Sequence, residues 1–546
     1  YLFSSLMQEI YQRLFKALQQ NNGQILAPLP PSNFQEEKPP FGAGVFPDRL
    51  FALAGSYQPH QLTMLIDAAI DTIAHKALPH PTKEQLKMEE NGKTVELQFI
   101  PANFAGAAKQ FWRDYFRVVQ VWKTLEPSED NILLELNSYL DTAELQPSYQ
   151  ATAPATDFAL ALLDYPYQTK FASALYDRGT YAGVMPSRSL FPSTAEVAAL
   201  ELFKANSEAA QTLLYKNPQQ DGPDEQDLNR FYEQIGQTTS LSHIAADYHK
   251  YYCIVHADGD SFSKILNTFS GSTQHANITH FSKLLADFSV VAAKTIDQFG
   301  GKPVYIGGDD LLFFVPLRTE RIQTSDGTGV IGSVFELLQQ LDIDFQKHFT
   351  ARLSLPTEIA PSLSYGISIA YYKYPLFEAH RLSFDQLKDQ AKKYRDAKQQ
   401  KDAVAFRLLK HSGSYFQGVI TKDQLGSLSV ILNMMDDIPE MFFSSIAFKL
   451  DTLKALLNEL LRTQSLTATR LQALFENFFD EPVHRANPDA LQAIHGLVLV
   501  LFSQQEQQVD GEAIDPTKNL YAILRLLMFM VSNRNQKITS KTEAHV

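Results

Sequence analysis

Two carboxylates follow a pair of glycines in the segment Val304–Phe314, where Gly307, Gly308, Asp309 and Asp310 separate two apolar runs. Apolar runs joined by a Gly-Gly turn predict a β-hairpin. Glycine adopts positive φ and leaves room for a ribose or a phosphate against the backbone. Carboxylate oxygens are the ligands that Mg²⁺ prefers. The turn is therefore a candidate metal and nucleotide site.

A third carboxylate, Asp258, ends the apolar run Tyr251–His256 and lies 51 positions before Asp309. If the two segments form adjacent strands, Asp258 comes to lie beside Asp309. Metal ions shared by Asp258, Asp309 and Asp310 can acidify a ribose hydroxyl, orient it toward an α-phosphate and neutralise the leaving pyrophosphate. We therefore predict nucleotidyl transfer, with these three aspartates as catalytic residues and as ligands of two Mg²⁺ or Mn²⁺ ions.

The residues that follow Asp258 are expected to bind the nucleotide. They begin a helix, and free N–H groups at the start of a helix can hold triphosphate oxygens. The Gly259 carbonyl can add a further oxygen ligand to the metal. The predicted contacts in this turn are Gly259, Asp260, Ser261, Phe262 and Ser263. The alternative is a polar β-turn with an ordinary Ser/Asp helix cap.

A lysine-rich helix is predicted over Phe384–Lys401, after a strand over Ser362–Tyr372. Within it, Lys392 or Lys393 can reach the β- and γ-phosphates of a nucleotide as a point charge. The alternative is a solvated helix face, because acidic residues are interleaved at a spacing that forms ion pairs along one helix.

The predicted elements form two similar units. A helix over 1–20, strands over 24–29 and 50–56 and a helix over 60–77 make most of a β-α-β-β-α-β unit, whose opening strand would lie before residue 1. The segments around Asp258, the hairpin and the strand after it, with a helix over Phe281–Gln298, make a second such unit. The remaining segments are mostly helical by their apolar spacing, including Phe111–Val121.

The expected fold class is therefore α+β, with two ferredoxin-like palm domains of the nucleotide cyclase and polymerase type, helical insertions and a C-terminal helical bundle. We expect a first, non-catalytic palm at 1–104 and a mainly helical connecting region at 105–248. The catalytic palm is expected at 249–417 and the bundle at 418–546.

Composition excludes several classes of protein. The 546 residues carry a net charge of −13, so bulk electrostatic coating of nucleic acid is not expected. The single cysteine, Cys253, allows no disulfide within the chain and no Cys-based zinc cage, which fits the cytoplasm. No apolar run is long enough to span a membrane. The chain contains no His-Asp dipeptide and no Walker-type phosphate loop.

Taken together, these motifs resemble the large, polymerase-like subunit of type III CRISPR RNA-guided effector complexes, particularly the Cmr (III-B) branch. The resemblance spans about Ser5 to Gly413. The matching motifs are Leu190–Ala198, Ala257–Asp260 with Ser263–Leu266, Gly307–Asp310, Gly366–Leu376 and Ala391–Lys393.

The resemblance implies that a palm without metal ligands pairs with a catalytic palm and that ATP binds between them. Target RNA would switch on synthesis of 3′,5′-linked cyclic oligoadenylates, which act as second messengers. Asp258, Asp309 and Asp310 would be metal ligands, and Gly307 and Gly308 would line the acceptor nucleotide. The implied partners are other subunits of a CRISPR ribonucleoprotein, with CRISPR RNA and target RNA held largely by those subunits. Small helical subunits would meet the C-terminal bundle.

The sequence departs from the family pattern in three respects, which limits the family properties that we expect of this chain. The His-Asp nuclease domain that often opens such subunits is missing, so no DNase activity is expected. The zinc-binding cysteines are replaced by the segment Asp177–Pro186, which gives zinc no support. Tyr371 stands where a histidine is common.

Other functions remain open from the residues alone. The same metal site can transfer AMP from ATP to another adenosine-containing small molecule. A stand-alone nucleotide cyclase needs one palm and a homodimer, whereas this chain is expected to supply two palms itself. A third possibility is a non-catalytic scaffold subunit, in which Asp309 and Asp310 would have no catalytic role.

Overall fold

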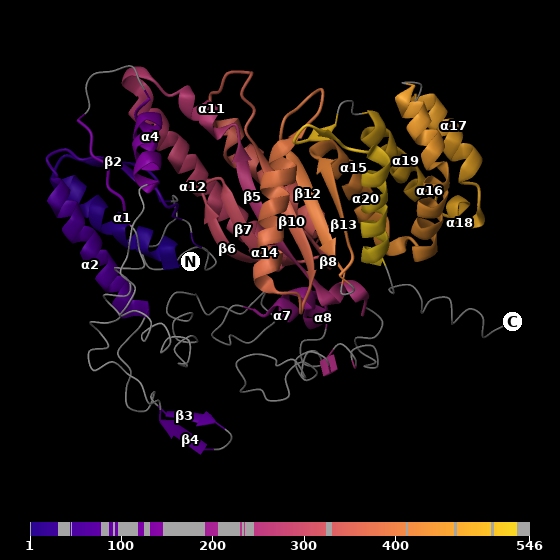
Figure 1. Cartoon of the computed structure of the whole chain (residues 1–546), viewed down its shortest axis with the longest axis horizontal. Coiled ribbons are helices and arrows are strands. Elements are labelled where there is room, and N and C mark those ends of the chain that lie inside the picture. The colour runs from indigo at the N-terminus through magenta and orange to yellow at the C-terminus, as the bar shows by residue number, and fades with distance from the viewer. Residues whose placement is uncertain are drawn as a thin grey trace.

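The structure is a computed structural model that places a mixed β-sheet between an N-terminal unit and a set of C-terminal helices (Figure 1). It describes residues 2–30, 44, 46–77, 87–90, 93–96, 118–124, 131–145, 192–205, 230–231, 234, 245–323, 330–410, 413–463, 467–503 and 507–531. Within these residues the α+β fold class is confirmed.

The central sheet has six strands in the order β13-β12-β10-β5-β7-β6. Their bounds are Tyr251–Asp260 (β5), Lys302–Gly307 (β6), Asp310–Pro316 (β7), Ser362–Tyr371 (β10), Ala403–Leu409 (β12) and Tyr415–Thr421 (β13). The neighbours among β10, β5, β7 and β6 are antiparallel. With the helices between them, these four strands form the ferredoxin-like β-α-β-β-α-β unit that the sequence predicts. β12 extends it in parallel to β10, and β13 follows antiparallel.

Each face of the sheet is covered by its own helices. Odd-numbered residues of β5, such as Val255, lie in the main core, which α12 (Gln274–Phe299) and α13 (Val334–His348) cover. Even-numbered residues, such as Ile254, pack under α7 (Thr194–Ala198) and α14 (Leu376–Asp385). This alternation also decides that the even-numbered Asp258 faces the α14 side.

The lysine-rich segment differs from the predicted helix over Phe384–Lys401. The helix begins earlier, as α14, continues as a π-helical turn over Gln386–Gln390 and ends in a 3₁₀ turn over Ala391–Lys393. The chain then forms a short strand, β11 (Tyr394–Arg395). The helix stops there because Asp396 Oδ1 accepts from the backbone N–H groups of Lys398 (2.7 Å) and Gln399 (2.8 Å), which closes a local turn.

The N-terminal unit has the predicted order of elements: α1 (Leu2–Gln20), β1 (Gln24–Ala27), β2 (Phe51–Leu53) and α2 (Pro59–Ala77). It is joined to the palm by a backbone bridge between Gly44 and the free edge of β6, with Gly44 N–Val304 O at 3.0 Å and Ile306 N–Gly44 O at 2.7 Å. Lys283 of α12 also donates to the Pro30 carbonyl at 3.0 Å.

The region between the two units is described only in part. It contains a hairpin, β3 (Lys87–Glu90) and β4 (Lys93–Glu96), and the helices α4 (Ile132–Glu144), α7 and α8 (Leu200–Ala205). The predicted helix at Phe111–Val121 is wrong for residues 118–121, which are not helical. Residues 111–117 and the segment Asp177–Pro186 lie outside the described residues.

The chain from α15 onward is mainly helical, as predicted. Its helices are α15 (Lys422–Met434), α16 (Glu440–Arg462), α17 (Ala468–Phe478), α18 (Pro482–Arg485), α19 (Pro488–Ser503) and α20 (Pro516–Val531). A hairpin of β14 (Gln508–Val509) and β15 (Glu512–Ala513) pairs with β11. None of the described helices is long and apolar enough to cross a membrane.

The bundle is fastened to the sheet by buried polar contacts. Arg318, at the start of β8 (Arg318–Gln323), donates to the Met530 carbonyl at 2.7 Å and pairs with Asp436 at 2.5 Å. Asn519 of α20 accepts from the Val419 N–H at 3.0 Å and donates to the Val419 carbonyl at 2.5 Å. Because β13 is the edge strand of the sheet, Asn519 satisfies backbone groups that would otherwise be buried without a partner.

Asn519→Ala should lower the free energy of unfolding by about 2 kcal/mol, since it leaves the buried N–H and C=O of Val419 unsatisfied. Denaturant unfolding measures the change. The control is Asn477→Ala, an exposed asparagine that bonds within its own helix. Equal effects of the two substitutions would contradict a role for Asn519 in fastening the bundle.

Candidate functional site

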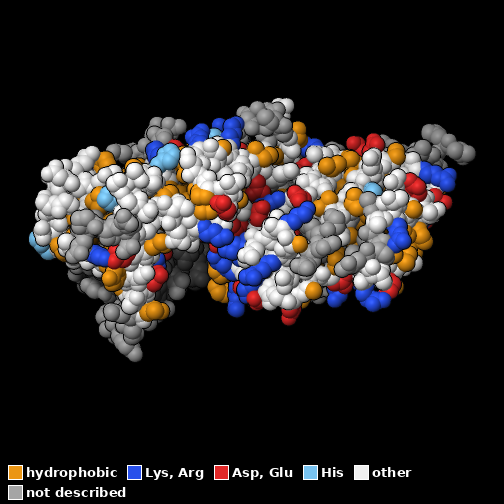
Figure 2. All heavy atoms as spheres, turned by 90° about the horizontal axis from the view of Figure 1, so that it is seen from above, with side chains coloured by type: hydrophobic (Ala, Val, Ile, Leu, Met, Phe, Trp, Pro, Cys, Tyr) orange, Lys and Arg blue, Asp and Glu red, His pale blue; other side chains and the backbone are white. Residues whose placement is uncertain are grey.

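The structure brings the three predicted aspartates to one end of the palm sheet. In the β5–β7 pairing Ala257 lies opposite Leu311, so the next residues are Asp258 on one strand and Asp310 on the other. A Cβ atom placed on Gly259 would lie 2.7 Å from the Asp309 Cβ. Figure 2 looks down on the molecule of Figure 1 and shows acidic and basic side chains gathered in a hollow near the middle of that face.

Burial and mutual repulsion shape the charge of these carboxyl groups. Burial, and then the charges of Asp310 and Asp258, raise the pKa of Asp309 to about 7. Desolvation, and then the charge of Asp258, raises the pKa of Asp310 to about 6. Carboxyl groups that repel one another in this way gain strongly from a divalent cation, whose charge reverses both causes of the shift.

Two lysines, Lys388 of the π-helical turn and Lys392 of the 3₁₀ turn that follows it, lie over Asp258. Lys388 Nζ is 2.5 Å from Asp258 Oδ2, and Lys392 Nζ is 3.3 Å from Asp258 Oδ1. Lys392 also donates to the Gly259 carbonyl at 2.6 Å. Lys393 lies outside the site, because it pairs with Asp510 at 2.9 Å and with Asp389 at 3.3 Å. Of the two lysines predicted to bind phosphate, the structure therefore places only Lys392 beside the carboxylates.

Lys388 is a site residue that the sequence analysis did not single out. A usable signal was present: Lys388 precedes Lys392 by four positions, and residues at that spacing share one face of a helix. A second such residue is Asp48, an exposed residue of the N-terminal unit. Besides desolvation and Asp258, its charge also contributes to the raised pKa of Asp310. Nothing in the local sequence indicates this proximity.

Asp260 is buried and its carboxylate is occupied by groups of the protein. Oδ2 accepts from Ser364 at 2.6 Å, from Ser362 at 3.1 Å and from the backbone N–H of Asp402 at 3.2 Å. Oδ1 accepts from Lys392 at 2.8 Å. We predicted that Asp260 contacts the nucleotide. In the structure its carboxylate binds groups of the protein and orients Lys392.

The other residues of the predicted phosphate-binding turn differ in backbone conformation and in exposure. Ser261 has a φ of +66°, and the helix that follows, α11 (Phe262–Asn267), is short. Phe262 stacks on Phe349 at 5.4 Å between ring centroids and packs against the main core, so its ring does not face a nucleotide. Ser263 is exposed. The turn therefore has the features of a tight strand-to-helix connection.

The hairpin glycines differ in their surroundings. A Cβ on Gly307 would lie 2.1 Å from the Tyr305 hydroxyl, so this glycine is needed for packing. Gly308 has a φ of +75°, and a Cβ there would meet nothing nearer than Leu285 at 3.9 Å. Gly308 thus combines a backbone conformation that favours glycine with open space that a ligand can enter.

The approach of the lysine segment to the sheet depends on Gly366 of β10, which pairs with His256. A Cβ at Gly366 would lie 2.2 Å from the Leu387 backbone nitrogen and 2.3 Å from the Ser383 carbonyl oxygen. Both atoms belong to backbone, so no side-chain rotation could relieve the clash. Gly366 is therefore required for the position of Lys388, the residue after Leu387.

Two residues of β5 near the candidate site, His256 and Cys253, have structural and not catalytic environments. His256 Nδ1 lies 2.8 Å from Ser383 Oγ, and burial, with the charges of His380 and Lys388, lowers the His256 pKa to about 3. Cys253 is fully buried, and burial raises the pKa of its thiol. Neither residue is set up for acid-base or nucleophilic chemistry near neutral pH.

The donor set fits a hard divalent cation through its oxygen ligands and its raised carboxyl pKa values. Within the described part of the chain, however, no three His, Cys, Asp or Glu side chains are already arranged around one metal position. The lysines explain this, because Lys388 and Lys392 pair with Asp258 from the side that faces α14. The roles of Asp258, Asp309 and Asp310 as metal ligands stay predictions.

Comparison with known proteins gives a family match over the segment that carries the candidate site. Residues 251–405 match the family model described as Cas10/Cmr2, second palm domain. Over 218 residues the chain is 29% identical to the CRISPR system Cmr subunit Cmr2 of Pyrococcus furiosus, an alignment that covers 35% of this chain and 21% of that protein. The matched part is thus about a fifth of the relative's length.

Solved structures show looser likeness. Type III-B Cmr-beta bound to cognate target RNA aligns over 69% of this chain and 51% of that chain, with 12% identity and a TM-score of 0.41. The Csm1-Csm4 cassette in complex with cA4 aligns over 97% of this chain and 65% of that chain, with 11% identity and a TM-score of 0.34.

Gly366→Ala should displace the π-helical turn and withdraw Lys388 from Asp258, at a cost of about 1–3 kcal/mol in unfolding free energy. Amide hydrogen exchange at Leu387 should accelerate as well. The matched control is Gly426→Ala in α15, where the new Cβ would meet only Gln339 at 4.0 Å and helix propensity improves. Unchanged exchange at Leu387 in Gly366→Ala would contradict the assigned packing.

Asp309→Asn should stabilise the metal-free protein at pH 8 by on the order of 1 kcal/mol and much less at pH 5. The sign follows from the raised pKa: between pH 4 and 7 the folded state holds a proton that the unfolded state has lost, so stability falls as pH rises. Denaturant unfolding in EDTA at both pH values tests this. Glu358→Gln, which removes an exposed carboxyl group, is the control. A stabilisation that is the same at both pH values would count against the repulsion.

Proposed function

Since residues 251–405 are a second palm domain of the Cas10/Cmr2 family, we propose that this chain is the polymerase-like subunit of a type III-B CRISPR effector complex. Its second palm transfers adenylyl groups from ATP and makes a cyclic oligoadenylate second messenger when the complex binds target RNA. The observation that carries the proposal is the convergence of Asp258, Asp309 and Asp310 beside a Gly-Gly turn and two lysines.

In this reaction Asp258, Asp309 and Asp310 would hold Mg²⁺ or Mn²⁺, ions that supply charge neutralisation and an acidified hydroxyl in nucleotidyl transfer. The open space at Gly308 admits the acceptor ribose close to the backbone. Once a bound cation neutralises its charge, the Asp258 carboxylate would no longer pair with Lys388 and Lys392. The ammonium groups of Lys388 and Lys392 are then free to bind phosphate oxygens of the donor.

Asp260 keeps Lys392 in place throughout. Its other oxygen is bound to Ser364 and Ser362, so the carboxylate cannot rotate away without breaking buried hydrogen bonds. We therefore assign Asp260 a positioning role, in which it aims the Lys392 ammonium at the space in front of Asp258.

The partners in this proposal are the other subunits of the ribonucleoprotein, through which CRISPR RNA and target RNA are largely held. The net charge of −13 supports this division, because an acidic chain gains little from broad contact with RNA. The relative named Cmr2 is a subunit of a Cmr system. The C-terminal helices offer a surface for small helical subunits.

The test is to incubate the complex containing the full chain with labelled ATP, Mn²⁺ or Mg²⁺ and matching target RNA, and to analyse products by mass spectrometry. A cyclic adenylate should appear with the wild-type chain and fall by about 100-fold or more in Asp309→Ala/Asp310→Ala, because charge stabilisation by bound metal is lost. The control, Asp480→Ala/Asp489→Ala, removes two exposed carboxylates from the bundle.

Each other outcome points to a stated alternative. A product in which AMP is joined to a different adenosine-containing molecule would replace cyclic oligoadenylate synthesis by adenylyl transfer to that acceptor. No product from a correctly assembled, RNA-bound wild-type complex would support a scaffold subunit. Product that is unchanged in Asp309→Ala/Asp310→Ala would remove the metal site from the mechanism.

A further inference from the structure

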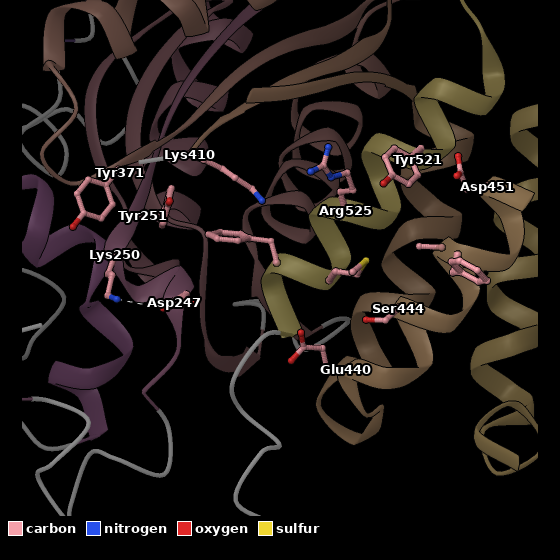
Figure 3. A pocket seen from close by; sticks show the side chains of 14 residues that line it. Asp247, Lys250, Tyr251, Tyr371, Lys410, Glu440, Ser444, Asp451, Tyr521 and Arg525 are labelled. Atoms are coloured by element: carbon pink, nitrogen blue, oxygen red, sulfur yellow. Dashed lines mark hydrogen bonds and ion pairs between the residues drawn. The ribbon is translucent and has the colours of Figure 1, made fainter. Parts of the chain in front are cut away.

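A groove of about 820 Å³ lies between the palm sheet and the C-terminal helices (Figure 3). Its palm wall includes Tyr251, Tyr371 and Lys410, and its bundle wall includes Phe448 of α16 with Tyr521 and Arg525 of α20. This volume falls in the range of small-molecule and cofactor sites.

The groove is separate from the carboxylate site. Tyr251 begins β5 and Asp258 lies seven residues further along the same strand, a distance of roughly 23 Å at about 3.3 Å per residue. β10 runs the other way, with Tyr371 at the groove and Ser364 opposite Asp258. The two sites therefore lie at opposite ends of the same pair of strands.

Two cations point into the groove from opposite walls, Lys410 from the end of β12 and Arg525 from α20 (Figure 3). Among the residues that the structure places, neither forms an ion pair with a carboxylate. By contrast, the third cation of the groove, Lys250, is paired with Asp247 at 3.3 Å. Two cations that form no ion pair and face one space can bind a phosphate group between them.

Exposed aromatic rings flank these cations. Phe448 is 75% exposed and Tyr521 is 42% exposed. The Arg525 guanidinium lies 5.4 Å from the centre of the Tyr521 ring and 5.5 Å from that of the Phe416 ring. Aromatic faces beside basic groups are the usual means of holding a base and its phosphate without reading sequence.

The acidic residues of the bundle wall narrow the ligand class further. Glu440 and Asp451 line the groove opposite the palm. An ionised carboxylate only accepts hydrogen bonds, so these groups suit ribose hydroxyls and exocyclic amino groups. They would repel a ligand that offers only negative charge.

We propose that this groove is a second, non-catalytic binding site for a ribonucleotide unit. Its phosphate lies between Lys410 and Arg525, and its base lies against Tyr521 or Phe448. A free nucleotide and a single-stranded RNA share this chemistry. The site goes beyond the proposed transferase function, because it uses none of the residues assigned to catalysis.

The experiment measures fluorescence anisotropy of a labelled ATP analogue and of labelled hexaadenylate RNA with the full chain in EDTA, which removes metal-dependent binding at the aspartates. Lys410→Gln/Arg525→Gln should weaken binding by about tenfold or more, since two charge-assisted contacts are lost. Lys410→Arg should keep most of the affinity. The control, Arg462→Gln/Arg485→Gln, removes two exposed charges of the bundle outside the groove and should bind as wild type.

The relative affinities identify the source of the ligand. Tighter binding of hexaadenylate than of the ATP analogue supports an RNA strand, and equal binding supports a free nucleotide. The proposal is overturned if the wild-type chain binds neither probe in EDTA, or if the control variant loses as much affinity as Lys410→Gln/Arg525→Gln. It is also overturned if a cross-linker placed at Tyr521 captures a partner subunit while neither probe competes. Because this assay contains no metal and measures no product, a failure of the transferase proposal would be seen separately.

Discussion

The repulsion among three carboxylates at the end of β5 is the constraint around which the second palm is arranged. Burial raises the pKa values of Asp309 and Asp310, and the negative charge of Asp258 raises both further. Such a cluster is relieved by protonation or by cations that lie close to it. In this structure the compensation comes from Lys388 and Lys392. In the proposed reaction it would come from metal ions, while Lys388 turns to the phosphates and Lys392 contacts them from its place on Asp260.

Several features of the palm serve to hold those lysines. Gly366 lets the backbone at Leu387 touch the sheet, and the π-helical turn and the 3₁₀ turn after it place Lys388 and Lys392 over one carboxylate. Asp260 anchors Lys392 from within the sheet. Asp402, whose backbone bonds to Asp260, also lies near Lys422, the first residue of the C-terminal helices. The end of the sheet that carries the candidate site is thus continuous with the polar contacts that fasten the bundle.

The sequence was sufficient for the parts of this arrangement that depend on local pattern. The hairpin around Gly307 and Gly308, the strand that carries Asp258 and the order of elements in both units follow from apolar spacing and turn residues. The lysine segment was predicted as one long helix because neither the approach at Gly366 nor the Asp396 turn can be seen without tertiary contacts. For the same reason the sequence could not separate Lys392 from Lys393, whose partner Asp510 is more than a hundred residues away.

The most direct test of the central claim is an experimental structure of the chain with Mn²⁺ and a non-hydrolysable ATP analogue, with metal located by anomalous scattering. The account predicts a manganese peak in contact with Asp258 and Asp309, with the Lys388 ammonium moved from Asp258 to a phosphate oxygen. A nucleotide bound elsewhere, with no metal at these aspartates and the Lys388–Asp258 pair intact, would contradict it.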